Sequence, residues 1–549
     1  MHEIELKFQI PAHRLDEVRA ELSRLGANLA SPLILQAAYF DTPDRRLAQA
    51  RSALRVRREG DDWVQTLKAA GSHTMLRVED NRPTEAPATG QALAPDLQLH
   101  TDEAARAALV HALGWQPEDD ARGERTGLIE LYRTDMRRTR ALCTISAGTA
   151  HEGVVELALD EGAILAGSLS QEVRELEIEL VSGHPQAVID AGRDWVRNFG
   201  LWLDTQTKAH RGDRLARRAA QAEPQPAPPS AHRSTPHTHT PAPTEARPAR
   251  LPRDATLEQA WRAGLEACLA HITANLSELA SLPPDAPPAQ VDALAYQWRR
   301  GLRRLATLAA LLKSTHLPDE AARATQASRK LARQLSQKLG PWRDAAGLAW
   351  IPLKIHQQGG PLLAVPTSCS PASSSTADGL PDTVAALARS ADATELCLQV
   401  LTALVDATPV QAAPHALTQA AAPWLEQHLE AEHRACRQAV PRGEHATPQE
   451  AHRLRKRLRA LRDARSLFET QATHQAGESG RCGQSGEAQA LDRALRTLGE
   501  LQDQVVALAR YQSASERDPQ ALFACGWLIG RRPRAVRRAM KALRRWSKA

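Results

Sequence analysis

Charged residues at alternate positions along short segments carry the clearest chemical potential in this chain. The N-terminal segment HEIELKF, residues 2–8, alternates apolar residues with Glu3, Glu5 and Lys7. The segment RELEIEL, residues 174–180, repeats the pattern with Glu175, Glu177 and Glu179. A period of two is that of a β-strand, so each segment is predicted to be a strand with one charged and one apolar face.

Three segments between these two share the pattern. They are residues 54–57 with Arg55 and Arg57, residues 76–79 with Arg77 and Glu79, and residues 155–160 with Glu156 and Asp160. Like charges along a strand repel unless a counter-charge, a metal or water lies between them, so we expect an antiparallel barrel with a shared ionic lumen. Guanidinium groups bind phosphate oxygens, and clustered carboxylates hold hard divalent cations such as Mg²⁺ or Mn²⁺. The strands therefore predict a site for a metal-bound polyphosphate.

The order of these motifs resembles the CYTH, or triphosphate tunnel metalloenzyme, superfamily over residues 1 to about 215. The matching motifs are Glu3-x-Glu5-x-Lys7, Tyr39-Phe40-Asp41-Thr42, Leu54-Arg55-x-Arg57, Thr66-Leu67-Lys68, Arg77-x-Glu79, Thr134-Asp135-x-x-Arg138, Glu156 with Asp160, the Glu175 to Glu179 ladder, and Thr207-Lys208-Ala209-x-Arg211-Gly212. The resemblance implies an eight-stranded antiparallel tunnel in which basic residues grip a triphosphate and acidic residues hold metal ions.

The resemblance also implies roles for individual residues. The implied phosphate contacts are Lys7, Arg55, Arg57, Lys68, Arg77, Arg138 and Lys208. The implied ligands of Mg²⁺ or Mn²⁺ are Glu3, Glu5, Asp160, Glu177 and Glu179. The implied catalytic residues are Glu3, Glu5, Lys7, Arg55, Arg57, Lys68, Arg138 and Lys208. Glu156 and Glu175 share the same strand faces, and their roles stay open between metal binding and the orientation of water or basic side chains.

Length and composition predict more than one domain. A chain of 549 residues exceeds what a single hydrophobic core covers. Residues 223–252 are rich in Pro, Thr and His and poor in large apolar residues, which is typical of a flexible linker. We therefore expect a tunnel domain at 1–215, a Pro/His-rich flexible linker at 216–252 and a second domain at 253–549.

Charge is divided unevenly along the chain. Residues 1–220 contain 28 Lys+Arg and 34 Asp+Glu, which leaves 42 and 30 of the totals of 70 and 64 for residues 221–549. The net value of the second part, 42 − 30 = +12, predicts a polyanionic partner. The N-terminus has no basic region followed by an apolar one, and no stretch of about 18 apolar residues occurs. We expect a soluble, cytoplasmic protein without a membrane partner.

Two basic helices are predicted in the second part. After the linker, apolar residues recur at spacings of three and four, which is the period of an α-helix. Within this pattern, residues 297–305 and 452–462 each carry dense positive charge around an apolar stripe, like an internal repeat. Such crowding of cations is unfavourable without an anion, which favours phosphate binding over a merely solvated basic helix.

From about residue 253 the chain resembles the CHAD domain, an α-helical domain of two four-helix repeats that binds inorganic polyphosphate. The shared marks are the two basic helices, Leu339-Gly340-x-x-Arg343-Asp344, Leu498-x-x-Leu501-Gln502-Asp503 and Gly526-Trp527-Leu528-x-Gly530-Arg531. The implied polyphosphate contacts are Arg299, Arg303, Arg304, His452, Arg455, Lys456 and Arg459. Tyr296 stands where the first repeat usually has its histidine, and Tyr cannot become cationic at neutral pH, so weaker or different binding is expected there.

These patterns predict an α+β multidomain protein, with a β tunnel and flanking helices followed by an all-α domain. The predicted function is a metal-dependent inorganic triphosphatase that hydrolyses tripolyphosphate to pyrophosphate and phosphate, with a second domain that binds inorganic polyphosphate. Two alternatives stay open: a hydrolase or cyclase of an organic triphosphate such as ATP or thiamine triphosphate, and a non-catalytic polyphosphate-binding protein. Nucleic acid ranks last as a partner, because aromatic residues are not interleaved with the basic helices.

Overall fold

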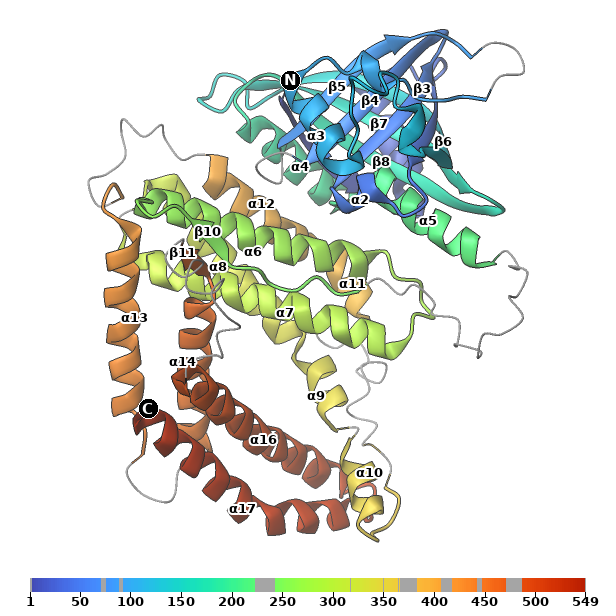
Figure 1. Ribbon diagram of the computed structural model, residues 1–549. Coiled ribbons are helices and arrows are strands. Elements are labelled where there is room, and N and C mark those ends of the chain that lie inside the picture. Colours follow the sequence, from blue (N-terminus) through green and yellow to red (C-terminus); the bar gives the residue numbers. More distant parts are fainter. Residues whose placement is uncertain are drawn as a thin grey trace. The chain divides into compact units, whose positions relative to one another are not determined.

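The computed structural model describes residues 2–70, 76–87, 92–222, 242–315, 317–348, 350–363, 365, 383–405, 417–441, 447–470 and 486–548. The chain divides into two compact units, Met1–Ala242 with Arg389–Leu398, and Pro243–Ala388 with Gln399–Ala549. The first unit is mainly β-sheet and the second is mainly helical (Figure 1). Within the described residues, no helix combines the length and the hydrophobicity that crossing a membrane requires.

The antiparallel sheet of the first unit closes on itself. Its strands are β1 (His2–Gln9), β2 (Leu33–Asp41), β3 (Ser52–Glu59), β4 (Asp62–Ala70), β5 (Leu76–Thr84), β6 (Ile129–Ile145), β7 (Gly153–Ala166), β8 (Leu169–Gly183) and β9 (Trp202–Leu203). They pair in the order β5-β4-β3-β2-β6-β7-β8-β1-β9, and β5 also pairs with β1, so that β1 to β8 form a barrel (Figure 1). Among the described residues the sheet has a ninth strand outside this barrel of eight, because the two-residue β9 pairs with the end of β1.

Helices pack on the barrel and fix which strand faces point inward. They are α1 (Leu15–Arg24), α2 (Arg46–Gln49), α3 (Glu103–Leu113), α4 (Gln186–Phe199) and α5 (Lys208–Ala222). Leu54 and Leu67 lie in an apolar cluster with α2 and α3, which turns Arg55 and Lys68 to the opposite, inner face. Asp41 holds α2 in place, because its carboxylate accepts hydrogen bonds from backbone N–H groups at the start of that helix.

Helix α5 closes one end of the lumen. The inner faces of β6, β7 and β8 become apolar at Tyr132, Ile164 and Val173, which lie two to six residues from the charged positions of the same faces. These side chains pack against Leu215 and Ala216 of α5. Helix α5 therefore covers this apolar end of the lumen.

The fit of α5 depends on Gly212. A Cβ atom added there would lie 2.2 Å from the ring of Tyr132, which is buried and stacked on Tyr39. We expect Gly212→Ala to displace α5 and to lower the free energy of unfolding by about 1–3 kcal/mol, as measured by urea denaturation. The control is Ala220→Ser at an exposed position of the same helix, and equal stability of the two variants would contradict this packing.

The second unit is helical apart from one pair of short strands. The helices after residue 252 are α6 (Leu257–Ala280), α7 (Pro288–Leu311), α8 (Asp319–Lys338), α9 (Gly340–Leu348), α10 (Trp350–Gln357), α11 (Val384–Ala388), α12 (Ala391–Val405), α13 (Ala421–Gln438), α14 (Pro448–Arg465), α16 (Gly486–Ala514) and α17 (Ala521–Lys548). The prediction of an all-α domain was wrong in one detail, since β10 (Ala249–Leu251) pairs in parallel with β11 (Phe468–Thr470). The division into two four-helix repeats stays a prediction.

The predicted linker is only partly within the described residues. Residues 216–222 continue α5, where Ala216 and Ala219 are buried, and residues 249–251 form β10. Residues 223–241, which carry most of the Pro/His-rich pattern, lie outside the described residues.

The two predicted basic helices are α7 and α14. Trp298, Leu302 and Leu305 form the buried stripe of α7. Helix α14 begins with a capping box between Thr447 and Glu450, in which each side chain bonds the backbone of the other residue. Its buried stripe consists of Leu454, Leu458 and Leu461, which pack in a cluster with residues of α16 and α17.

Candidate active site in the tunnel and candidate anion site in the helical unit

Three carboxylates lie in one row across neighbouring strands of the barrel. The register places Glu5 of β1 opposite Glu179 of β8, and Glu179 opposite Glu156 of β7. Like charges that oppose each other directly on a sheet are destabilising, so this row favours a cation. Lys7 Nζ lies 3.2 Å from Glu5 Oε1 at one end, and Arg140 Nε lies 3.4 Å from Glu156 Oε1 at the other.

A second group of carboxylates surrounds Lys208. The carboxylate oxygens of Asp160, Glu175 and Glu177 lie within 4.8 Å of one another, and all three residues are buried. Lys208 Nζ, at the start of α5, lies 2.6 Å from Asp160 Oδ2 and 3.0 Å from Glu177 Oε1, and it also contacts Glu175. The Lys208 ammonium therefore neutralises part of this group.

Arg138 and Lys7 bind the same group from β6 and β1. Arg138 donates two hydrogen bonds of 2.6 Å to Asp160 in a bidentate pair, and a third of 2.5 Å to Glu177 Oε2. Lys7 Nζ lies 2.7 Å from Glu177 Oε1. Glu177 thus contacts three cations, because Lys208 also reaches it, and it is the centre of the network.

The role of Glu175 was open from the sequence, and Arg211 was not among the predicted contacts. Both are buried, and they form an ion pair between β8 and α5. Gln9 Nε2 donates a further hydrogen bond of 3.2 Å to Glu175 Oε2. The signal for Arg211 was present in the motif at 207–212, whose lysine and arginine lie three residues apart and so share a helix face.

The network keeps its members ionised at neutral pH. Burial alone would raise the pKa of Glu177, but Lys208, Lys7 and Arg138 outweigh it and hold that pKa well below its usual range. Burial alone would lower the pKa of Lys208, but the surrounding carboxylates raise it instead. A phosphate chain would therefore meet fixed positive charges whose carboxylate partners hold them in position.

Acid should weaken the tunnel through this network. The pKa of Glu177 is depressed from 4.5, so its ion pairs stabilise the fold above that pH and lose this effect as the pH falls through the pKa of the folded state. We expect the stability difference between the native protein and Glu177→Gln to be largest near neutral pH and to shrink below about pH 4.5. Urea unfolding from pH 7 to pH 3 measures it, and a difference that is independent of pH would contradict this electrostatic account.

The cations on β3 and β4 have partners outside this network. Arg55 Nη1 donates to the hydroxyl of Tyr39 at 3.3 Å, and Lys68 Nζ lies 2.5 Å from Glu79 Oε2. Burial, aided by the charge of Arg55, lowers the pKa of Arg57 to about 10 even though Arg57 also pairs with Glu59. An anion bound beside Arg55 and Arg57 would relieve their mutual repulsion.

The predicted tunnel residues are largely brought together. Lys7, Arg138, Lys208, Asp160 and Glu177 share one network, while Arg55 and Lys68 lie on adjacent strands of the same barrel. Glu3 and Arg77 are register partners between β1 and β5, but their side chains lie outside the described residues. Glu5 and Glu179 face each other in the acidic row.

The donor set fits a hard divalent cation. Carboxylate oxygens are the ligands that Mg²⁺ and Mn²⁺ prefer. Asp160 is held bidentately by Arg138, and the acidic row has the cations Lys7 and Arg140 at its two ends. Both the acidic row with Glu5 and Glu179 and the buried group of Asp160, Glu175 and Glu177 offer ligands of this kind.

A cluster of arginines joins α7 and α14 in the helical unit. Arg303 Nε lies 3.9 Å from Asp463 Oδ2, which links the two helices. Burial, together with the nearby charges of Arg455, Arg303 and Arg299, lowers the pKa of Arg459 to about 9. The four arginines of this α7–α14 cluster are close enough to repel one another, so an anion would stabilise them.

Residues of the motifs at 339–344 and 498–503 lie beside this cluster. His452 Nδ1 lies 2.9 Å from Gln502 Oε1, and burial lowers the pKa of His452. Burial also lowers the pKa of Arg455. The charge of Asp503 opposes this shift, and the charge of Arg343 adds to it. The Gln-Asp pair of α16 and the arginine of α9 therefore lie beside the cluster.

Two predicted contacts, Arg304 and Lys456, and the exceptional Tyr296 have different surroundings. Arg304 is buried, and its Nη2 donates to the backbone carbonyls of Arg247 and Ser466 at 3.0 Å each, so it supports the fold and is removed from the candidate anion contacts. Arg303 and Arg304 are neighbours of the same type whose side chains point about 100° apart on the helix. The sequence alone did not show which of the two is buried. Lys456 is exposed, and Tyr296 is 59% exposed near Arg303.

The fold and the charged lumen define a β-tunnel protein with a separate basic helical unit. Residues 1–212 match the family model of the CYTH domain, and residues 263–512 match that of the CHAD domain. The chain therefore belongs to the proteins that carry a CYTH domain followed by a CHAD domain.

The individual relatives have low sequence identity to this chain. An inorganic triphosphatase of Haemophilus influenzae is 27% identical over 222 residues, which are 39% of this chain and 54% of that protein, so the chain matches about half of the relative's length. The CHAD domain of the plant Ricinus communis is 23% identical, covers 56% of this chain and 97% of its own, and has a TM-score of 0.38. A Hippeastrum protein described as a candidate adenylyl cyclase with a dominant triphosphatase activity is 21% identical and has a TM-score of 0.26. The match covers 37% of this chain and 90% of the Hippeastrum chain.

Proposed function

We propose that this protein is a metal-dependent inorganic triphosphatase that hydrolyses tripolyphosphate to pyrophosphate and phosphate. The observation that carries the proposal is the inner face of the barrel, where Arg138, Lys208 and Lys7 converge on buried carboxylates beside a row of three further carboxylates. The triphosphatase named among the relatives supports it over the CYTH half of the chain. A protein that only bound polyanions would gain nothing from so many carboxylates in its binding site.

The basic residues would hold the phosphate chain. Arg55, Arg57 and Lys68 offer donors on β3 and β4, and Arg138 offers a guanidinium fixed by Asp160. Fixed cations of this kind stabilise the charge that develops on phosphoryl oxygens in the transition state. Arg77 is proposed as a further contact because its backbone position on β5 lies on the same strand face as Glu79.

A divalent ion, Mg²⁺ or Mn²⁺, would be held by Glu5 and Glu179, with Glu3 and Glu177 at adjacent inner positions of the same two strands. Such an ion, when bound, neutralises phosphate oxygens and lowers the pKa of a coordinated water. The chain itself contributes the carboxylates that fix the ion and the lysines and arginines that align the phosphates. Alignment of the reacting groups removes much of the entropic barrier to attack by water.

The closed end of the lumen supports a short substrate. Leu215 and Ala216 of α5 pack against the apolar end of the lumen. A phosphate chain would therefore enter from the opposite side and stop at Lys208 and Arg211. This arrangement favours tripolyphosphate over threading of a long chain.

The substrate proposal is tested by turnover of tripolyphosphate, ATP and long-chain polyphosphate under the same conditions. We expect kcat/KM to be highest for tripolyphosphate. A higher kcat/KM for ATP would replace the proposal with an organic triphosphatase, and release of cyclic AMP would replace it with a cyclase.

We further propose that the helical unit binds inorganic polyphosphate at the α7–α14 cluster. The proposed contacts are Arg299, Arg303, His452, Arg455, Lys456 and Arg459. The proposal is supported by the proximity of four half-buried arginines, which a chain of phosphates would neutralise.

A further inference from the structure

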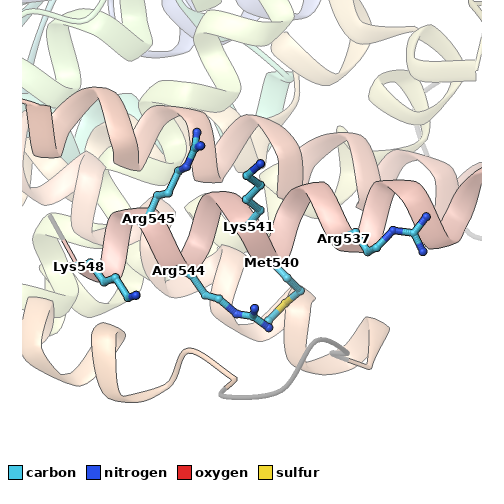
Figure 2. A pocket seen from close by; sticks show the side chains of 6 residues that line it. All are labelled: Arg537, Met540, Lys541, Arg544, Arg545 and Lys548. Carbon is cyan, nitrogen blue, oxygen red and sulfur yellow. The ribbon is translucent and has the colours of Figure 1, made fainter.

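Helix α17 presents a second basic surface that the α7–α14 cluster does not include. Its cations and one methionine line a hollow of about 360 Å³ (Figure 2). The lining residues are Arg537, Met540, Lys541, Arg544, Arg545 and Lys548. Figure 2 shows all six side chains on this one helix, and none of the lining residues carries a negative charge.

The spacing of these cations places them on one face of the helix. Arg537, Lys541, Arg544 and Lys548 follow one another at intervals of four, three and four residues, which is the repeat of a single helix face. At a rise of 1.5 Å per residue they extend over about 16 Å along the helix axis. A row of this length matches an extended polyanion better than a single small ion.

Carboxylates of the described residues do not explain most of these cations. Arg538, on an adjacent face, has Glu500 Oε2 at 3.7 Å. For four other exposed cations of α17, Arg537, Lys541, Arg545 and Lys548, no carboxylate of the described residues lies within 4.0 Å. The helix dipole favours cations in the last turn, which accounts for Arg545 and Lys548 but not for Arg537 and Lys541.

The surface is separate from the α7–α14 cluster. The apolar stripe of α14, which includes Leu454 and Leu458, packs in one cluster with Ala539 and Leu543 of α17. The arginines of α14 therefore lie on a different face of that helix from the one that contacts α17. The two basic surfaces are on different sides of this apolar layer.

We propose that the basic face of α17, centred on Arg537, Lys541 and Arg545, is a second binding surface for inorganic polyphosphate. This inference rests on the proposed binding of polyphosphate by the helical unit. The hollow has no aromatic lining on which bases could stack, since the nearby Trp546 is fully buried, and this favours a plain phosphate chain over nucleic acid. A long chain that engages both surfaces of one molecule gains affinity through the higher effective concentration of its second segment.

The test compares three variants of the full chain for binding of long-chain inorganic polyphosphate over a range of salt concentrations. The α17 variant is Arg537→Gln, Lys541→Gln and Arg545→Gln, and the cluster variant is Arg303→Gln, Arg455→Gln and Arg459→Gln. The matched control removes the same charge from exposed positions of α16 and the turn after it, as Arg493→Gln, Arg496→Gln and Arg517→Gln.

We expect the α17 variant to bind long chains at least fivefold more weakly than the control, with a salt slope that is smaller by about 2. Its hydrolysis of tripolyphosphate should be unchanged. A charge-retaining variant, Arg537→Lys with Arg545→Lys, should bind like the native protein, which separates loss of charge from loss of fold.

The outcomes distinguish the two proposals. Loss of binding in the cluster variant alone, with the α17 variant equal to the control, would refute the second surface and leave the first. Native affinity in both variants would refute the proposed polyphosphate binding itself. Displacement of polyphosphate by single-stranded DNA at equal phosphate concentration would replace the α17 proposal with a nucleic-acid surface.

Discussion

Glu177→Gln is expected to lower kcat/KM for tripolyphosphate at least 100-fold, which is the loss typical of removing one preorganised charge from an active site. Glu177 contacts all three of Lys7, Arg138 and Lys208. Without its charge, three buried cations share fewer carboxylates, and their positions relative to the phosphates would change. Phosphate release at saturating and at limiting tripolyphosphate separates the effect on kcat from that on KM.

The matched control lies on the same strand. Glu172 is exposed on β8 and pairs with Arg174, outside the network. Glu172→Gln removes the same charge and should keep nearly native turnover. Similar losses in both variants would show that the effect comes from net charge or folding of β8 and would contradict the role given to Glu177.

Arg57→Gln is expected to raise KM strongly, with a loss in kcat/KM of about 10²-fold to 10³-fold. Burial and the neighbouring Arg55 lower the pKa of Arg57 to about 10, so its charge is costly until an anion binds. Stability without substrate should change by less than about 1 kcal/mol, because the lost pair with Glu59 and the relieved burial of charge oppose each other. Steady-state kinetics and urea unfolding measure the two effects.

Arg58 provides the control for this prediction. It is the next residue of β3, it points to the other face, and its Nε donates to the carbonyl of Gly60 at 2.7 Å. Arg58→Gln should leave KM close to the native value. A large loss of stability in Arg57→Gln, with KM unchanged, would show that Arg57 serves the fold instead of the substrate.

Alternation of side chains made much of the tunnel predictable. A strand with an apolar face must turn that face to a core, so Leu54 and Leu67 fixed the inward direction of Arg55 and Lys68 without knowledge of the pairing. The closure of the barrel followed from the need to bring five charged faces together. The two-residue β9 and the β10–β11 pair were too short to leave a periodic pattern in the sequence.

Side-chain contacts between residues distant in the sequence were harder to predict. The ion pair of Arg211 with Glu175 joins residues that are 36 positions apart, and only the docking of α5 brings them together. Asp160 was predicted as a metal ligand, and its bidentate contact with Arg138 depends on the register between β6 and β7. Composition and spacing define which residues face the lumen, whereas the division of their roles depends on three-dimensional contacts.

The most direct test of the proposed function is phosphate release from tripolyphosphate by the full chain, first with a chelator and then with Mg²⁺ or Mn²⁺ restored. We predict no release in the chelator and rapid release of one phosphate and one pyrophosphate per tripolyphosphate once the ion is present. Absence of release with either ion, or release that the chelator does not affect, would contradict a metal-dependent triphosphatase in the tunnel.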